Sequence, residues 1–227
     1  MNPPANFDRL ARVYRWLEAL TFGPLLMRSR CAFLHDMSTC RTALVLGDGD
    51  GRFTARLLAA NPLVQIDAVD ASPAMLRALQ RNAGPNFARV RSYAADARTW
   101  QPLRADYALV TTHFFLDCLT TEEVSALATR LRSCIAPDAR WIVSEFTLPP
   151  NQFGRLIARP LVAALYRAFG LLTGLAVRQL PNHRHALSAA GFALAREHRL
   201  LSGLLVSELW RLAPPGDPAA QAGKTLL

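Results

Sequence analysis

Apolar residues along this chain fall into short runs that alternate with segments of helical spacing. Residues 43–46 are apolar and run directly into a glycine-rich stretch, and residues 52–60 then show the periodicity of a helix. Four more strand-like runs follow, at 64–69, 88–95, 106–111 and 140–146. A helical segment over 120–134 and a turn at Pro137 and Asp138 precede the last run. This alternation predicts a parallel sheet with helices on both faces.

The last third of the chain predicts antiparallel strands. A short helix over 182–190 ends at Gly191, the residue type that commonly closes a helix. Residues 192–200 and 204–212 then alternate apolar and polar positions, as neighbouring antiparallel strands do. The expected fold is therefore α/β, with a Rossmann-like seven-stranded sheet.

Two helical regions lie outside this alternation. Residues 6–20 and 24–37 predict N-terminal helices within a cap over 1–40, and a helical insertion over 149–180 follows the fifth strand. The apolar stretch 153–177 exceeds the roughly 20 residues of a membrane span, but arginines and helix breakers interrupt it: Arg155, Arg159, Pro160, Arg167 and Gly170. We expect it to form an apolar wall over the active site; peripheral membrane contact is the alternative.

The glycine-rich turn is the main chemical signal. Gly47, Gly49 and Gly51 stand at alternate positions between a buried strand and a helix start, the junction at which α/β proteins bind nucleotides. Glycines let a ligand approach the backbone and permit positive φ, and the helix start offers unpaired N–H groups. Asp70, 23 residues after Gly47, closes the second strand, where a carboxylate can hold a ribose diol. Asp96 ends the third strand.

The loop carboxylates favour one class of cofactor. Dinucleotide folds usually carry GxGxxG, whereas here the third glycine comes one residue earlier and the loop contains Asp48 and Asp50. Two carboxylates would repel a pyrophosphate but suit a ligand with an ammonium and a sulfonium group. The electrostatics therefore favour S-adenosyl-L-methionine (SAM) over NAD.

With these motifs the chain resembles the class I SAM-dependent methyltransferases, and it is similar to the small-molecule enzymes of ubiquinone and menaquinone biosynthesis. The matching stretches are 47–51, 69–76 and 95–97, with 7–11 and Tyr14 resembling the segment that covers the cofactor. The chain departs from the family at Val45, where an acidic residue is common. The resemblance implies that Asp48 or Asp50 takes over part of the contact to the methionine ammonium.

The cofactor-binding residues implied by the motifs span several strand ends. We expect Asp70 to hold the ribose hydroxyls, Asp96 to accept from the adenine amino group and Ala97 to leave room for the ring. Ser72 and Met75 would flank the adenine, and Tyr14 would close over the methionine end or hold the first helix. The full candidate set is Tyr14, Gly47, Asp48, Gly49, Gly51, Asp70, Ala71, Ser72, Met75, Asp96, Ala97 and Thr112.

Methyl transfer requires alignment, exclusion of water and, for some acceptors, removal of a proton. His113, just past the fourth strand, is the candidate catalytic base, with Asp117 to orient it; packing on the cofactor without proton transfer is the alternative. Glu145 would bind the acceptor or pair with an arginine of the cap. His183 and His185 would lie about 200° apart on a helix, so no metal site is expected.

Composition bounds these interpretations. The chain has 227 residues, is 51% hydrophobic and carries a net charge of +9. This predicts one domain over 1–212 and a tail without ordered structure over 213–227. Widely spaced cysteines and the absence of a secretory signal pattern predict a cytoplasmic protein. A small apolar or aromatic acceptor is favoured, and a nucleic-acid acceptor is unlikely because a base-gripping Asn/Asp-Pro-Pro-aromatic motif is missing. A catalytically silent, cofactor-binding partner subunit is the non-enzyme alternative.

Overall fold

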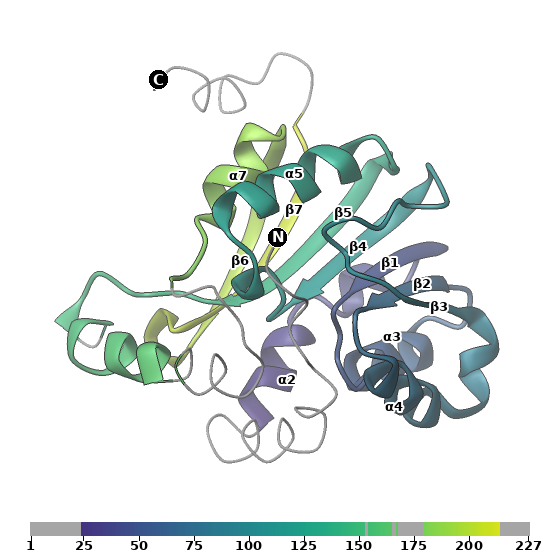
Figure 1. Cartoon of the computed structure of the whole chain (residues 1–227), viewed down its shortest axis with the longest axis horizontal. Coiled ribbons are helices and arrows are strands. Elements are labelled where there is room, and N and C mark those ends of the chain that lie inside the picture. Colours follow the sequence, from purple (N-terminus) through teal and green to yellow (C-terminus); the bar gives the residue numbers. More distant parts are fainter. Residues whose placement is uncertain (1–23, 153, 165–166, 168–178, 214–227) are drawn as a thin grey trace.

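The computed structural model describes residues 24–152, 154–164, 167 and 179–213. Within these residues, seven strands form one sheet in the order β3-β2-β1-β4-β5-β7-β6 (Figure 1). β7 is antiparallel to both of its neighbours, β5 and β6, whereas the other pairs are parallel. The strands are β1 (Thr42–Leu46), β2 (Gln65–Asp70), β3 (Val90–Ala94), β4 (Tyr107–His113), β5 (Ile135–Phe146), β6 (Phe192–Leu200) and β7 (Leu205–Leu212). The predicted α/β fold with a seven-stranded sheet is confirmed.

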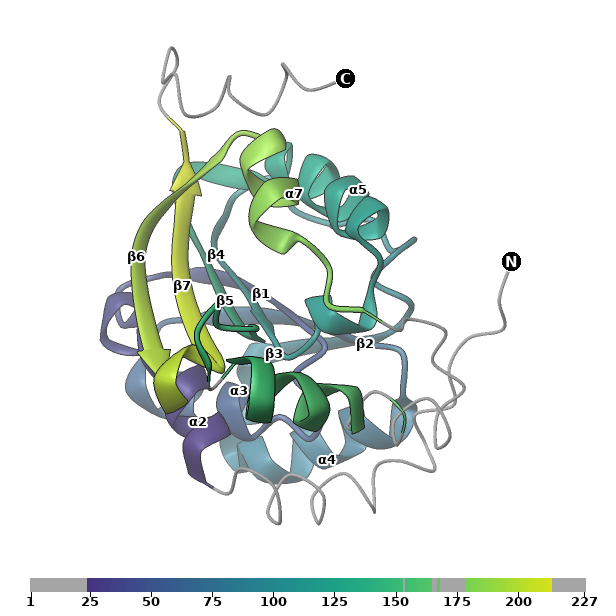
Figure 2. The same cartoon turned by 90° about the vertical axis from the view of Figure 1, so that its left-hand side faces the viewer.

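Helices cover both faces of the sheet because successive residues of β1 point in opposite directions. Ala43 and Val45 belong to the hydrophobic cluster that contains Phe53 of α3 (Arg52–Ala60). Leu44 and Leu46 belong to a second cluster with residues of α5 (Thr121–Arg132). Figure 2 shows α5 and α7 (His183–Ala189) on one side of the sheet and α3 and α4 (Pro73–Ala83) on the other.

The helix starts follow the local sequence. Thr120 accepts a hydrogen bond from the Glu123 backbone N–H, and the Glu123 side chain accepts one from the Thr120 N–H, so α5 begins with a capping box. Asn182 accepts from the His185 N–H at the start of α7. Gly191, with φ 87°, follows that helix as expected.

Three predicted boundaries are wrong. The segment 24–37 is not one helix, because α2 (Pro24–Arg30) ends and successive i+3 hydrogen bonds lead into the 3₁₀ turn η1 (His35–Met37). The third strand starts late, because Gly84–Arg89 forms the 3₁₀ helix η2. The fifth strand starts early, at Ile135.

That early start places Pro137 and Asp138 within β5. Tyr107 pairs with Ile135 and Leu109 pairs with Arg140, so β4 advances two residues while β5 advances five. A bulge absorbs the additional residues, and it tolerates a proline that has no N–H to donate to the ladder.

The insertion after β5 is helical where it is described. Gly154–Ala158 forms a π-helical turn, η4, and residues 159–164 continue as α-helix. Ala158 and Val162 pack in a cluster with Leu26 of α2 and with Leu204 and Leu205, which follow the 3₁₀ turn η5 (Leu201–Gly203). In Figure 1 this segment stands out from the sheet at the lower left.

Among the described residues, no helix has the length and apolar character needed to cross a membrane. The helix predicted over 6–20, Tyr14, most of 165–178 and residues 214–227 lie outside the described residues.

Candidate cofactor site at the carboxyl ends of the strands

The three loop glycines all adopt positive φ, at 65°, 62° and 76°, as the loop prediction anticipated. They differ in their surroundings. A Cβ on Gly47 would collide with the Phe115 ring, and one on Gly51 would collide with Leu79 of α4. A Cβ on Gly49 would meet no atom within 4 Å. Gly47 and Gly51 therefore admit close packing within the protein, and Gly49 is the glycine that leaves space for a ligand.

The two loop aspartates have different environments. Asp48 Oδ2 accepts hydrogen bonds from the backbone N–H (2.8 Å) and hydroxyl (2.6 Å) of Thr54, in the first turn of α3. Its Oδ1 is buried and has no hydrogen-bond partner among the described residues. Burial raises the pKa of Asp48 to about 6. Asp50 instead forms an ion pair with Arg52 at 2.9 Å. Of the two loop carboxylates, Asp48 is therefore the better candidate to accept a hydrogen bond from a ligand.

The end of β2 carries Asp70 beside the start of α4. Asp70 Oδ1 accepts a hydrogen bond from the Ser72 N–H at 2.8 Å. Ser72 Oγ accepts from the Met75 N–H and caps α4, and both side chains are buried, whereas Ala71 is exposed. Ser72 therefore has a local structural role in the turn that holds Asp70.

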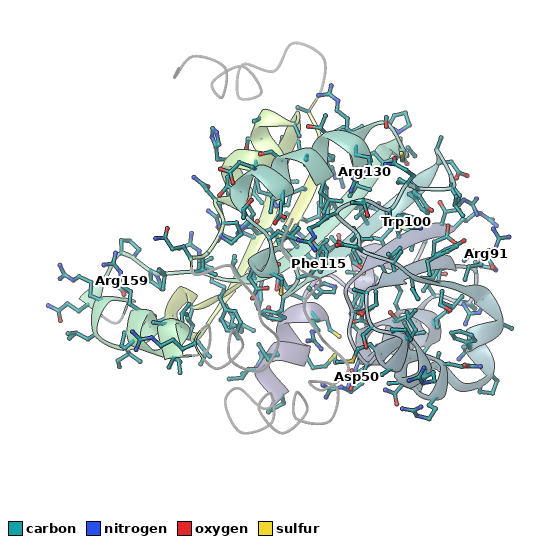
Figure 3. All side chains as sticks on the ribbon, viewed as in Figure 1. Asp50, Arg91, Trp100, Phe115, Arg130 and Arg159 are labelled. Carbon is teal, nitrogen blue, oxygen red and sulfur yellow. The ribbon has the colours of Figure 1, made fainter. Side chains whose placement is uncertain are left out.

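The carboxylate of Asp96 is paired with Arg98. The shortest contact, from Arg98 Nη2 to Asp96 Oδ2, is 2.6 Å, and hydrogen bonds from Arg98 hold the pKa of Asp96 below its ordinary value. Arg130 of α5 donates to the carbonyls of Ala97 and Arg98. Figure 3 labels Arg130 and Trp100 in this region. Neither arginine was predicted from the sequence; a basic residue two positions after Asp96 was the available signal for Arg98.

His113 lies at the end of β4 in a buried polar row. Its Nδ1 is 2.9 Å from Ser144 Oγ, its ring packs edge-on against Phe53, and only 2% of the residue is exposed. Its Nε2 is buried without a hydrogen-bond partner among the described residues. Burial, followed by the charge of Arg30, holds the pKa of His113 well below its ordinary value. The imidazole is therefore neutral at physiological pH.

Asp117 does not orient His113, contrary to the sequence-based expectation. The hydrogen-bond partner of the imidazole is Ser144, which itself lies 3.3 Å from Ser207 Oγ. Asp117 would need a helical turn after His113 to reach it, but the chain bends at Phe114, with φ 53°. Thr112, on the opposite face of β4, accepts a hydrogen bond from the Trp141 indole N–H at 3.0 Å. No local pattern pointed to the serines.

Glu145, at the end of β5, binds backbone. Its Oε1 accepts from the N–H groups of Phe115 (3.1 Å) and Leu116 (2.8 Å), and its Oε2 is buried without a hydrogen-bond partner among the described residues. Burial and the charge of Asp117 raise the pKa of Glu145 well above its ordinary value. We expected Glu145 to bind the acceptor or to pair with an arginine of the cap. The hydrogen bonds that its side chain makes are instead to the backbone N–H groups of Phe115 and Leu116.

His183 of α7 has a structural role. His183 Nε2 lies 3.1 Å from Glu208 Oε2, and Arg184 and Trp210 also donate to this buried carboxylate. Within the described part of the chain, no group of three or more His, Cys, Asp or Glu side chains is arranged to hold a metal ion.

Residues 43–138 match the family model described as a methyltransferase domain. Among curated proteins, no sequence with significant similarity to this chain was found. Many solved structures share the fold, and three of them serve as examples. The mitomycin 7-O-methyltransferase MmcR has a TM-score of 0.69 at 18% identity, over 91% of this chain and 60% of that one. An O-methyltransferase family protein from Burkholderia thailandensis has a TM-score of 0.67 at 15% identity, over 92% of this chain and 61% of that one.

The CcbJ methyltransferase from Streptomyces caelestis has a TM-score of 0.61 at 19% identity, over 82% of this chain and 90% of that one. This chain spans about 60% of the length of the first two structures. The family match thus covers residues 43–138, and the solved structures show that the chain shares the fold of these methyltransferases.

Proposed function

We propose that the protein transfers a methyl group from SAM to a small, apolar or aromatic acceptor. The observation that carries this proposal is the juxtaposition at one sheet edge of a glycine loop, open at Gly49, with the buried Oδ1 of Asp48. Asp70 ends the neighbouring strand, since Leu46 of β1 pairs with Val69 of β2. A cationic amino-acid end and a ribose would each find a carboxylate at this edge.

The methionine end is assigned to Asp48. Its Oδ2 is used by Thr54, and its Oδ1 would accept from the ammonium group. Asp50 is less suited because Arg52 already neutralises it. This assignment compensates for Val45, which is buried in the core and carries no charge.

The adenosine end is assigned to Asp70 and Asp96. Asp70, which the Ser72 N–H holds at the end of β2, would accept from the ribose hydroxyls. At Asp96, the adenine amino group would share the carboxylate with Arg98, so this contact would be the weaker of the two. Ala97 is small and buried beside it.

Apolar side chains at the ends of β4 and β5 support an apolar acceptor. The rings of Phe114 and Phe146 lie 5.1 Å apart. Both pack against the cluster that contains Leu26, Val162 and Leu205. SAM supplies the methyl group on an activated sulfonium, so the protein need only align the acceptor and exclude water. His113, a neutral and deeply buried imidazole, is assigned a packing role beside the cofactor.

The experiment is a methyl-transfer assay with methyl-labelled SAM and a panel of phenols and other aromatic acceptors, preceded by a thermal-shift titration. We expect S-adenosylhomocysteine (SAH) to raise the melting temperature and at least one acceptor to gain label. A shift with NAD and none with SAH would overturn the proposal. Binding of SAH without turnover of any acceptor would favour the partner-subunit alternative.

A further inference from the structure

The chain bends immediately after β4 through an unfavourable backbone conformation. Phe114 has φ 53°, a region that non-glycine residues rarely occupy. Its N–H remains in the ladder and donates to the Ser144 carbonyl at 2.7 Å. Such a conformation persists only when surrounding contacts hold it, and it is concentrated at functional sites.

A side chain from the neighbouring strand accepts hydrogen bonds from the backbone directly after this bend. Glu145 Oε1 accepts from two consecutive N–H groups, those of Phe115 and Leu116, at the start of the 3₁₀ turn η3 (Leu116–Cys118). Glu145 is 1% exposed, so these hydrogen bonds form away from water. Without this oxygen, two N–H groups of the turn would lose their acceptor.

An aromatic ring that follows the bend lies on the glycine loop. Figure 3 shows Phe115 near the centre of the molecule. The Phe115 ring occupies the space that a Cβ on Gly47 would need, so it rests directly on the first glycine. A series of direct contacts thus leads from Glu145 on β5, through the Phe115 turn, to the loop that follows β1.

We propose that Glu145 is a positioning residue for the cofactor: it fixes the turn after β4, and the turn seats Phe115 against Gly47, which sets the shape of the glycine loop. The inference rests on the proposed function, because the loop's ligand is taken to be SAM. It assigns to a carboxylate on the acceptor side of the sheet a role in binding on the cofactor side.

The test is calorimetric titration with SAH of the wild type, Glu145→Leu, Phe115→Ala and their double variant. We expect each single change to weaken binding about tenfold, the range seen for residues that act through a packed network. The double variant should bind no more weakly than Phe115→Ala, because Glu145 acts through that ring. Glu145→Gln, which keeps an acceptor oxygen, should stay close to the wild type.

Glu208→Gln is the matched control. It alters another fully buried carboxylate of the same sheet, so it should lower thermal stability while leaving the affinity for SAH unchanged. If Glu145→Leu does not fold, Glu145→Asp, whose shorter side chain withdraws the acceptor, takes its place in the cycle. Unchanged SAH affinity in the Glu145 variant used, or additive losses in the double variant, would overturn the inference about Glu145 but not the proposed function. Failure of the wild type to bind SAH would overturn the proposed function as well.

Discussion

The two halves of the strand-end edge differ in how their contacts are made. In the half formed by β1, β2 and β3, carboxylates accept from residues close in sequence, as Asp48 does from Thr54 and Asp70 from Ser72. In the half formed by β4 and β5, Glu145 reaches back to Leu116 and His113 to Ser144. We propose that the first half presents carboxylates to a ligand, whereas the second buries its polar groups behind apolar rings. This difference suits a charged cofactor beside an apolar acceptor.

The largest effect should come from the glycine that joins the two halves. Gly47→Ala introduces a Cβ into the Phe115 ring at a positive φ and should cost about 3 kcal/mol of unfolding free energy. Gly49→Ala, with φ 62° and open space around the Cβ, should cost only about 1 kcal/mol. Urea unfolding measures both. Gly49→Ala should nevertheless lose SAH binding; equal stability losses for the two variants would remove the distinction between the glycines.

Asp70→Ala should weaken SAH binding about a hundredfold, because two charge-assisted hydrogen bonds contribute about 3 kcal/mol together. Asp106→Ala is the control, since Asp106 is an exposed carboxylate just before β4, at the opposite edge of the sheet. Calorimetry on both variants measures the effect. If they bind SAH equally well, Asp70 does not hold the ribose.

Binding should depend on the ionisation of Asp48. Because burial raises the pKa of Asp48 to about 6, its carboxylate is charged above that pH, and affinity for SAH should fall as the pH drops through 6. Stability should move the other way: the raised pKa means that the folded state binds this proton more tightly than the unfolded chain, so Asp48 contributes more stability as the pH falls from 6 to 4. Asp48→Asn should bind about tenfold more weakly than the wild type above pH 6, and its affinity should not change as the pH passes through 6. A flat wild-type profile in calorimetry would contradict the assignment.

These contrasts explain which features the sequence could predict. The glycine loop, the Thr120–Glu123 capping box and the end of α7 at Gly191 depend on neighbouring residues, so local patterns were sufficient. The bulge at Pro137 depends on pairing with β4, which a local pattern cannot reveal. The partner of His113 lies on another strand, and the partners of Glu145 are backbone N–H groups that follow a bend in a distant segment. Neither could be predicted from neighbouring residues in the sequence.

On the acceptor side, His113 should matter only modestly. Loss of a general base typically costs 10²–10⁴-fold in rate, whereas we expect His113→Gln to lower kcat by less than about tenfold. With the pKa of His113 held well below its ordinary value, the wild-type kcat should show no ionisation near neutral pH from this residue. A thousandfold loss in His113→Gln, with SAH affinity unchanged, would establish it as the base.

The smallest effect concerns the surface of the insertion. Leu156 and Ile157 are 74% and 53% exposed and adjoin the exposed Arg155 and Arg159, a combination that fits an anionic lipid surface. We propose peripheral contact there, and expect the paired changes Leu156→Asp and Ile157→Asp to reduce sedimentation with phosphatidylserine vesicles about threefold. Leu103→Asp, at 67% exposure elsewhere, is the control. An equal reduction in the control would show that the contact is unspecific.

The central claim, that the edge formed by the glycine loop and Asp70 binds SAM, is tested most directly by a crystal structure of the protein with SAH. We predict the ammonium group within hydrogen-bond distance of Asp48 Oδ1, the homocysteine chain over Gly49 and both ribose hydroxyls on Asp70. SAH bound away from these residues, or crystals grown at saturating SAH that contain none, would contradict the account.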